Sequence, residues 1–342
     1  MSHVKAANLL LPLLCSLPVL AAAQTGASAE TPDEIIVTGR QPGPPMWRVI
    51  NGENVLWIFP QLTPVPKDMI WESDKAAAVI ARAQEVLQLP NIGVDVSTRV
   101  YLNPVNLFRG MRLAKRLSRD PAGRTLEEAL PPALYARFLA LEAKYFPNDS
   151  EELEELRPAF AAERMVGSVQ SKEGLGGDGD IMKTLQRLIR RNRDAERTEI
   201  EVKVDLEGGF GELAKRAEGL TASLDPALEL ECFESQLSRM ENDVDEMRRR
   251  ANSWARGYID DFRGAPLPGS DEDSCLALIV SSSERDVFVD TRAKLDTLWL
   301  ENAERALHAH RTTFAILPIG DLLRSEGPIA KLKAKGYEVR EP

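Results

Sequence analysis

Two short stretches near opposite ends of the chain have the same form. Each begins with four apolar residues, continues with proline and two further residues, and ends in a short polar residue; they are Leu56–Thr63 and Phe314–Asp321. A short apolar run bounded by a turn signal is typical of a buried strand. We therefore expect two buried strands, and we expect their ends to meet in any active cleft that the protein has.

The first 23 residues have the composition of an export signal. Lys5 precedes an apolar run from Ala6 to Leu20, and small residues lead up to a cleavage site between Ala23 and Gln24. The run is too short to be a good membrane span. We predict a signal peptide over 1–23, a flexible leader over 24–45, and an exported protein, periplasmic or secreted, that is not an integral membrane protein after signal removal.

Two cysteines remain after this cleavage, Cys232 and Cys275, because Cys15 lies within the signal. In an oxidising compartment a disulfide between them is the natural interpretation, and two buried thiols are the alternative. The chain has no Cys-x-x-Cys and no cluster of cysteine with histidine, so the sequence predicts neither a zinc site nor another cofactor.

The composition is that of a globular protein. Of the 342 residues, 43% are hydrophobic and 28% are charged, which is enough apolar material for one large domain or two small ones. We predict a single domain over 46–342. The formal charge of −10 argues against a general binder of nucleic acid or of anionic membranes, since such proteins are expected to be basic.

The order of elements predicts an α/β (α+β) fold with a central mixed sheet. Asn51-Gly52 between β-rich runs predicts an N-terminal hairpin over 47–59. A helix is expected from Ser73 or Asp74 through Leu87, followed by a large helical insertion over about 105–195. At the C-terminus, the pattern predicts a strand at 314–317, a helix at 322–335 and a last strand at 337–339.

Two features of the middle region suggest a function, but each has a simpler explanation. Four glycines between 174 and 179 invite a phosphate-loop interpretation, but no strand precedes them and a mobile linker is expected. An arginine-rich run over 187–193 is interpreted as a helix end.

The clearest predicted helix has Asp225 as its N-cap and Pro226 at its first position. Its apolar seam from Leu230 to Trp254 is expected to pack within the chain, and pairing with a partner helix is the alternative.

Several of these stretches together resemble the TraB/GumN (Tiki-like) family. The N-terminal hairpin from Pro45 to Phe59 is similar to the opening of that family, and the segment from Thr313 to Val339 is similar to its close. Trp254-Ala255-Arg256-Gly257 resembles its Trp-x-x-Gly-Asp element, with Tyr258 in place of the aspartate. The resemblance implies a metal-dependent peptidase or related hydrolase, with a Gly-x-x-His motif at each of two strand ends.

This chain departs from the family pattern at both motifs. Proline replaces each glycine, and Thr63 and Asp321 stand where the resemblance implies histidine. An acidic residue that the family carries falls near Gln88. A threonine hydroxyl is a poor substitute for imidazole, so we predict no metal site. The candidate cleft is expected to be lined by Trp57, Pro60, Gln61, Thr63, Trp254, Pro318 and Asp321.

Our leading hypothesis is therefore an exported, catalytically degenerate member of this family, a pseudoenzyme that binds a peptide, an envelope component or a protein partner. The alternative is a working metal-dependent hydrolase with relocated ligands. That alternative would require convergence of Thr63, Asp321, His308 or His310, and an acid such as Asp68 or Asp95. A third hypothesis is a structural envelope protein that dimerises through the Leu230–Trp254 seam.

Overall fold

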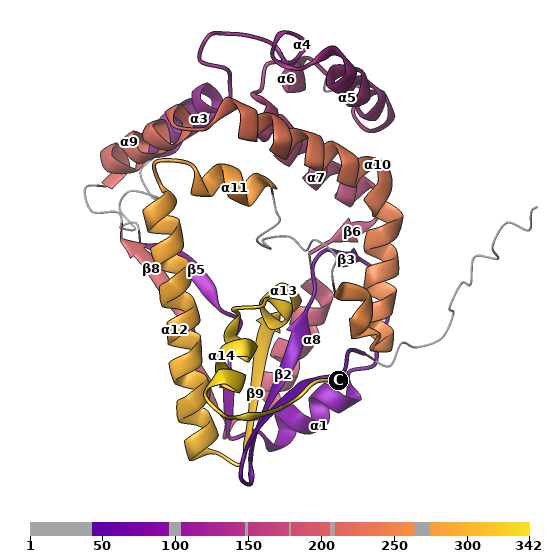
Figure 1. Cartoon of the computed structure of the whole chain (residues 1–342), viewed down its shortest axis with the longest axis vertical. Helices are drawn as coiled ribbons and strands as arrows, with labels where there is room; N and C mark the ends of the chain where they lie inside the picture. Colours follow the sequence, from indigo (N-terminus) through magenta and orange to yellow (C-terminus); the bar gives the residue numbers. More distant parts are fainter. Residues whose placement is uncertain (1–42, 96–103, 148–149, 178, 206–208, 264–273) are drawn as a thin grey trace, which may run out of the picture. The chain divides into compact units, whose positions relative to one another are not determined.

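The computed structural model describes residues 43–95, 104–147, 150–177, 179–205, 209–263 and 274–342 of the chain (Figure 1). The predicted signal peptide over 1–23 and almost all of the predicted leader over 24–45 lie outside the described residues. Export and cleavage between Ala23 and Gln24 therefore stay predictions.

A six-stranded mixed sheet lies at the centre of the described fold. Strand β1 is antiparallel to both of its neighbours, and the next four strands in the order are mutually parallel. Across the sheet the order is β10 (Glu338–Arg340), β1 (Trp47–Asn51), β2 (Asn54–Gln61), β9 (Thr312–Pro318), β4 (Glu85–Leu87) and β7 (Glu196–Thr198). The predicted mixed sheet, N-terminal hairpin and C-terminal strand–helix–strand order are confirmed, but the single helix expected over 322–335 is two helices, one ending at Leu323 and the next beginning at Pro328.

The two apolar stretches form the adjacent parallel strands β2 and β9. Their register places Trp57 opposite Phe314 and Gln61 opposite Pro318. Every residue from Phe314 to Leu317 is at most 1% exposed. A parallel strand covered on both faces has a continuous apolar sequence, and this explains the two runs.

One boundary in this region was predicted wrongly. The helix expected through Leu87 ends early, since α1 spans Asp74–Arg82, and Glu85–Leu87 is the strand β4. All three β4 residues are fully buried, between β9 on one side and β7 on the other. Tertiary pairing on both edges thus overrides the local helical pattern.

The remaining short strands make two small sheets. One is antiparallel and consists of β3 (Val65–Pro66) and β6 (Leu175–Gly176). The other is parallel and consists of β5 (Asn91–Asp95) and β8 (Glu201–Asp205).

Helices surround two separate apolar cores. The helices that contribute to the first core, around the sheet, are α1, α8 (Gly179–Arg191), the end of α10 (Pro226–Arg256), α12 (Arg285–Ala309), α13 (Ile319–Leu323) and α14 (Pro328–Ala334). The second core is helical and contains α4 (Leu126–Ala129), α5 (Pro132–Tyr145), α6 (Ser150–Glu154), α7 (Pro158–Lys172) and the first half of α10. Most of the predicted helical insertion thus packs with α10 around the second core, while α8 packs against the sheet.

The long helix α10 contributes to both cores. Asp225 caps it as predicted, accepting a hydrogen bond from the backbone N–H of Ala227 at 2.8 Å. From its seam, Phe233 and Leu237 are buried in the second core and Trp254 in the first. The seam therefore packs within the chain, which removes the apolar stripe that dimerisation through it would require.

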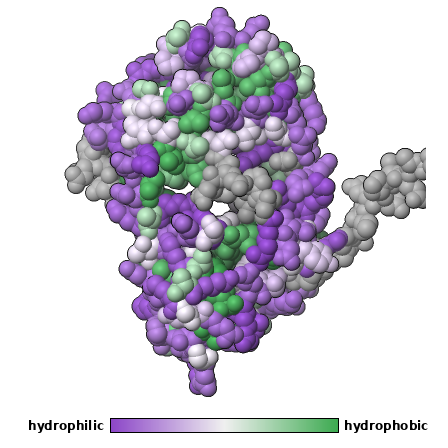
Figure 2. Space-filling model, in the orientation of Figure 1, coloured by the Kyte–Doolittle hydropathy of each residue, from purple (hydrophilic) through white to green (hydrophobic). Residues whose placement is uncertain are grey.

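Hydrophilic residues cover most of the face seen in Figure 2. Hydrophobic residues gather on this face around α13, next to the ends of β2 and β9. Among the described residues, no helix is long and apolar enough to cross a membrane.

The predicted disulfide is present. Cys232 of α10 is bonded to Cys275 of α11 (Ser274–Val280), at a sequence separation of 43 residues. It fastens α11 to the part of α10 that lies in the second core.

Replacing both cysteines by serine is expected to lower the free energy of unfolding by about 4 kcal/mol, because a loop of this length is no longer closed in the unfolded chain. Urea unfolding of the double variant, beside the parent under oxidising and reducing conditions, measures the difference. The reduced parent should match the variant; two free thiols in exported protein would contradict the prediction.

Candidate functional site

The carboxyl ends of four parallel strands meet at one edge of the sheet. They are the ends of β2, β9, β4 and β7, at Gln61, Pro318, Leu87 and Thr198. In open α/β sheets, ligands bind outside the carboxyl ends of the strands. The two motif positions of the sequence therefore lie at the edge where a ligand is expected.

The predicted cleft residues of β2 differ in their surroundings. Pro60 is buried and Gln61 is 7% exposed, whereas Thr63 is exposed and precedes a cis peptide bond to Pro64. Trp57 lies further back on the strand. The guanidinium groups of Arg48 and Arg82 are each within 5.6 Å of its ring centroid, so Trp57 belongs to the body of the sheet.

Trp254 supports the end of β2 from inside the core. It is fully buried, and its indole N–H donates a hydrogen bond to the backbone oxygen of Pro60 at 2.7 Å. Its ring packs against Phe59 and Trp71, with 5.9 Å between centroids in both cases. Trp254 thus positions the turn that carries the first motif.

The glycine three residues later has a clear structural reason. Gly257 follows the last residue of α10 with a φ of +86°, a left-handed conformation that favours glycine. A Cβ atom there would also lie 3.0 Å from Pro45. The Trp-x-x-Gly part of the element is therefore structural, and Tyr258 after it is 60% exposed.

Asp321 lies directly beyond β9, on α13, and is bound by two arginines. Its Oδ1 is 2.8 Å from an Nη atom of Arg292 and 3.4 Å from one of Arg324. Arg324 also contacts both carboxylate oxygens of Asp296 at 3.0 Å. Burial raises the pKa of Asp321 above the ordinary aspartate value, and the two arginines counteract part of this rise.

The residues at these two motif positions do not fit a divalent metal. Thr63 offers only a hydroxyl, and the carboxylate of Asp321 already neutralises Arg292 and Arg324. A cation near Asp321 would face two positive guanidinium groups, which Coulomb repulsion disfavours.

The two histidines of the relocated-ligand alternative lie at the opposite edge of the sheet. His308 and His310 precede β9 in the chain, whereas Asp321 follows it. A strand of seven residues separates the two ends by about 20 Å. The ligand set of the relocated-site alternative therefore does not converge: neither histidine can share an ion with Asp321.

The two acids of that alternative are also dispersed. Asp68 is an exposed residue after β3, and Asp95 ends β5 in a separate small sheet.

His310 does belong to a different group of possible metal ligands, which sequence reasoning missed. Ligand atoms of Glu85, Glu196 and His310 all lie within 4.8 Å of one another, at the amino ends of β4, β7 and β9. Glu85 is fully buried, and its carboxylate is bound by Arg305. Over 100 residues separate each of the three from the next, so no spacing motif reveals the group.

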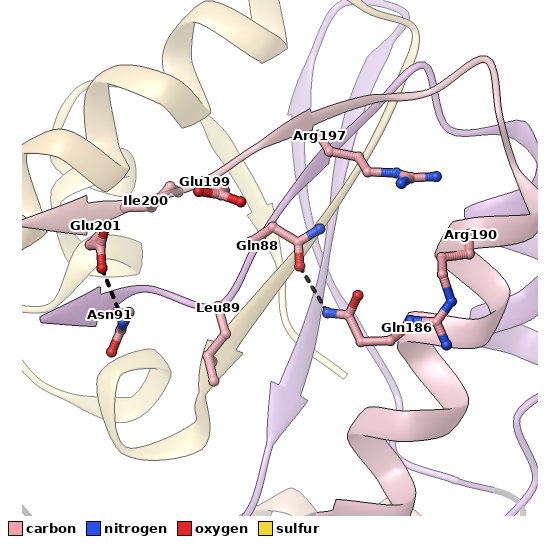
Figure 3. Close-up of a pocket in the computed structure, with 9 residues that line it drawn as sticks. All are labelled: Gln88, Leu89, Asn91, Gln186, Arg190, Arg197, Glu199, Ile200 and Glu201. Carbon is pink, nitrogen blue, oxygen red and sulfur yellow. Dashed lines mark hydrogen bonds between the residues drawn. The ribbon is translucent and has the colours of Figure 1, made fainter. Parts of the chain in front are cut away.

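A polar pocket lies at the carboxyl ends of β4 and β7, with a volume of about 540 Å³. Gln88 and Gln186 are joined across it by a hydrogen bond of 2.9 Å. Figure 3 shows the guanidinium groups of Arg190 and Arg197 on one side of this bond, and Glu199 and Glu201 on the other. The full lining is Gln88, Leu89, Asn91, Gln186, Arg190, Arg197, Glu199, Ile200 and Glu201.

This pocket could be found only in part from the sequence. Gln88 was singled out as the position of a missing acid, and Arg190 belongs to the arginine-rich run that was interpreted as a helix end. The run does end α8, but Arg190 also lines the pocket. The parallel pairing of β4 with β7 brings Gln88, the residue after β4, into the same pocket as Arg197.

Changing Trp254 to Phe is expected to lower the free energy of unfolding by about 2–4 kcal/mol, since a buried carbonyl loses its donor and a cavity forms. Chemical denaturation measures this. Trp57→Phe is the matched control, and its half-buried ring should cost about 1 kcal/mol or less. Equal losses for the two variants would contradict the supporting role of Trp254.

Comparison with known proteins agrees with the resemblance noted in the sequence. A model of the TraB/PrgY/gumN family matches residues 45–341, and no curated protein or solved structure matches the chain. The match covers the hairpin, the helical middle region and the C-terminal strand–helix–strand. The chain belongs to the TraB/PrgY/gumN family.

Proposed function

We propose that the protein is an exported binding protein of this family in which the metal chemistry implied by the resemblance has been lost. The observation that carries the proposal is the composition of the carboxyl edge. Thr63 and Asp321 occupy the two motif positions, and Asp321 is held between Arg292 and Arg324. Such an edge retains the scaffold of the site without a set of ligands for a metal.

The disulfide supports the export part of the proposal. Disulfides persist in oxidising compartments, and the bond between Cys232 and Cys275 is consistent with the periplasm or the extracellular space. The apolar run over 6–20 would direct the chain there.

The polar pocket is the binding site that we propose. Arg190 and Arg197 line the pocket, and no ion pair of either is found among the described residues. Arg197 donates one hydrogen bond to the backbone oxygen of Ile189 at 3.4 Å, and its other N–H groups, with those of Arg190, can donate to a carboxylate. On the other side of the pocket, the carboxylates of Glu199 and Glu201 can accept hydrogen bonds from N–H groups of a ligand. A short peptide with a free C-terminal carboxylate satisfies both sides at once.

Binding of a short peptide with a free C-terminus, compared with the same peptide amidated, tests this site. Calorimetric titration should show about tenfold tighter binding of the free form, because a charge-assisted hydrogen bond is lost on amidation. The double variant Arg190→Gln with Arg197→Gln should bind the free and the amidated peptide with equal affinity. The matched control is Arg187→Gln with Arg191→Gln, which are exposed on α8 and do not line the pocket.

The same titration can overturn the proposal. Equal affinity for the free and amidated peptides would exclude carboxylate recognition in the pocket. Hydrolysis of the peptide that stops on addition of a chelator would show that catalysis survives.

A second candidate function is a metal-dependent hydrolase whose ligands have moved to the opposite edge. The group Glu85, Glu196 and His310 favours it, because two carboxylates and an imidazole suit several divalent ions. Arg305 argues against it, since its guanidinium group already binds the Glu85 carboxylate. A metal would have to compete with that ion pair.

Metal analysis after dialysis separates the two candidates. If the leading proposal holds, the purified protein retains no stoichiometric metal ion, and the His310→Gln variant has the same metal content as the parent. A retained ion that is lost in His310→Gln and Glu196→Gln, but kept in the control His308→Gln, would establish the second candidate instead. His308 is a suitable control because its ring contacts Asn51 and Tyr337, away from Glu85.

A further inference from the structure

Helix α3 (Pro104–Leu117) has an unusual surface for a helix of a globular domain. None of its residues is buried. Four large apolar side chains are more than half exposed: Val105 at 54%, Leu107 at 63%, Phe108 at 53% and Met111 at 60%. Leu107 and Met111 are one turn apart, and Phe108 is three residues before Met111, so these three lie on one side of the helix.

The opposite side of α3 faces α9 (Gly209–Ala222). A Cβ atom added to Gly110 would lie 3.6 Å from the ring of Phe210, which shows that α9 is in van der Waals contact there. The partly buried residues of α3 are on this side: Asn106, Gly110, Leu113 and Leu117. The apolar residues of the other side are therefore not covered by α9.

The exposed side of α3 is also basic. The helix contains no Asp or Glu, and its four cations are Arg109, Arg112, Lys115 and Arg116. Arg116 pairs with Glu218 of α9, and the guanidinium group of Arg112 lies over the ring of Phe108 at 4.3 Å. Among the described residues, Arg109 and Lys115 make no ion pair. We call Leu107, Phe108, Met111, Arg112 and Lys115, with Arg109 at their flank, the outer face of α3.

We propose that the outer face of α3 binds the surface of a bilayer that contains anionic phospholipid. Exposed apolar side chains flanked by Lys and Arg are the pattern of a helix that lies in the membrane interface: the apolar residues enter the acyl boundary and the cations meet the phosphates. The long stems of Arg109 and Lys115 allow their charges to stay at the headgroups. This inference is independent of the proposed peptide site.

The acidic net charge of the chain does not oppose this contact strongly. The formal charge is −10 over the whole chain, but ionic screening limits its reach to about 8 Å at physiological salt. Within that range, the outer face presents only positive charge from α3 itself.

A second copy of the chain fits the outer face less well. In a symmetric contact the same surface meets itself, so Arg109 and Lys115 would approach their own copies and repel them. An anionic bilayer supplies the opposite charge without that penalty.

Co-sedimentation of the full chain with vesicles tests the proposal. Binding should be stronger to vesicles of phosphatidylcholine with phosphatidylglycerol than to phosphatidylcholine alone, and added salt should weaken it. The apolar run near the N-terminus would bind both kinds of vesicle. The measured quantity is therefore the ratio of the fraction bound to anionic vesicles to the fraction bound to neutral vesicles. A ratio near one would overturn the proposal.

Two pairs of variants assign the effect to α3. Arg109→Gln with Lys115→Gln, and separately Leu107→Ser with Met111→Ser, should each lower binding to the anionic vesicles by about tenfold or more. The matched controls are Lys75→Gln with Arg285→Gln for charge, and Val287→Ser with Val289→Ser for exposed apolar area; they should bind like the parent. Because the α3 residues are not buried, the midpoint of unfolding should stay unchanged.

The same variants can also contradict the proposal that α3 binds a bilayer. If the α3 variants bind vesicles like the parent, the proposal fails. If in addition they turn an oligomer into a monomer in light scattering, the outer face contacts a second copy of the chain.

Discussion

The parallel pairing of β2 with β9 is the interaction on which the rest of the structure depends. Its two strands, Asn54–Gln61 and Thr312–Pro318, lie about 250 residues apart in the chain, yet they share a seven-residue register at the centre of the sheet. Closing so long a loop costs entropy that burial of both strands must offset. Strand β4 then pairs with the other edge of β9, and β7 with β4, so β2 and β9 form the centre of the sheet.

That pairing also decides the chemistry available at the carboxyl edge. It brings Gln61 beside Pro318 and places the turns that carry Thr63 and Asp321 at the same edge. Two arginines bind the one carboxylate among these positions, and one of them, Arg324, also binds Asp296. The arginines at this edge are already paired with carboxylates, whereas the nearby polar pocket is lined by the guanidinium groups of Arg190 and Arg197.

Local patterns predicted those parts of the fold whose partners are near in sequence or whose apolar runs are unambiguous. The hairpin around Gly52 follows from turn chemistry, because its φ of +61° suits glycine. The N-cap of α10 at Asp225 is likewise local. Strand β4 was missed because three residues carry too little periodicity to distinguish a strand from a helix end.

The sequence by itself determined the buried strands, the long helix, the disulfide pair and the family, since each rests on a local pattern or on the count of cysteines. Only the tertiary structure decided which side chains meet. In the folded chain, His310 lies beside Glu85 and not beside Asp321. Gln88 and Arg197 line the same pocket, and the residues of the outer face of α3 are exposed. The physical reason is that strand register and helix packing are set by long-range contacts, which no single stretch of sequence records.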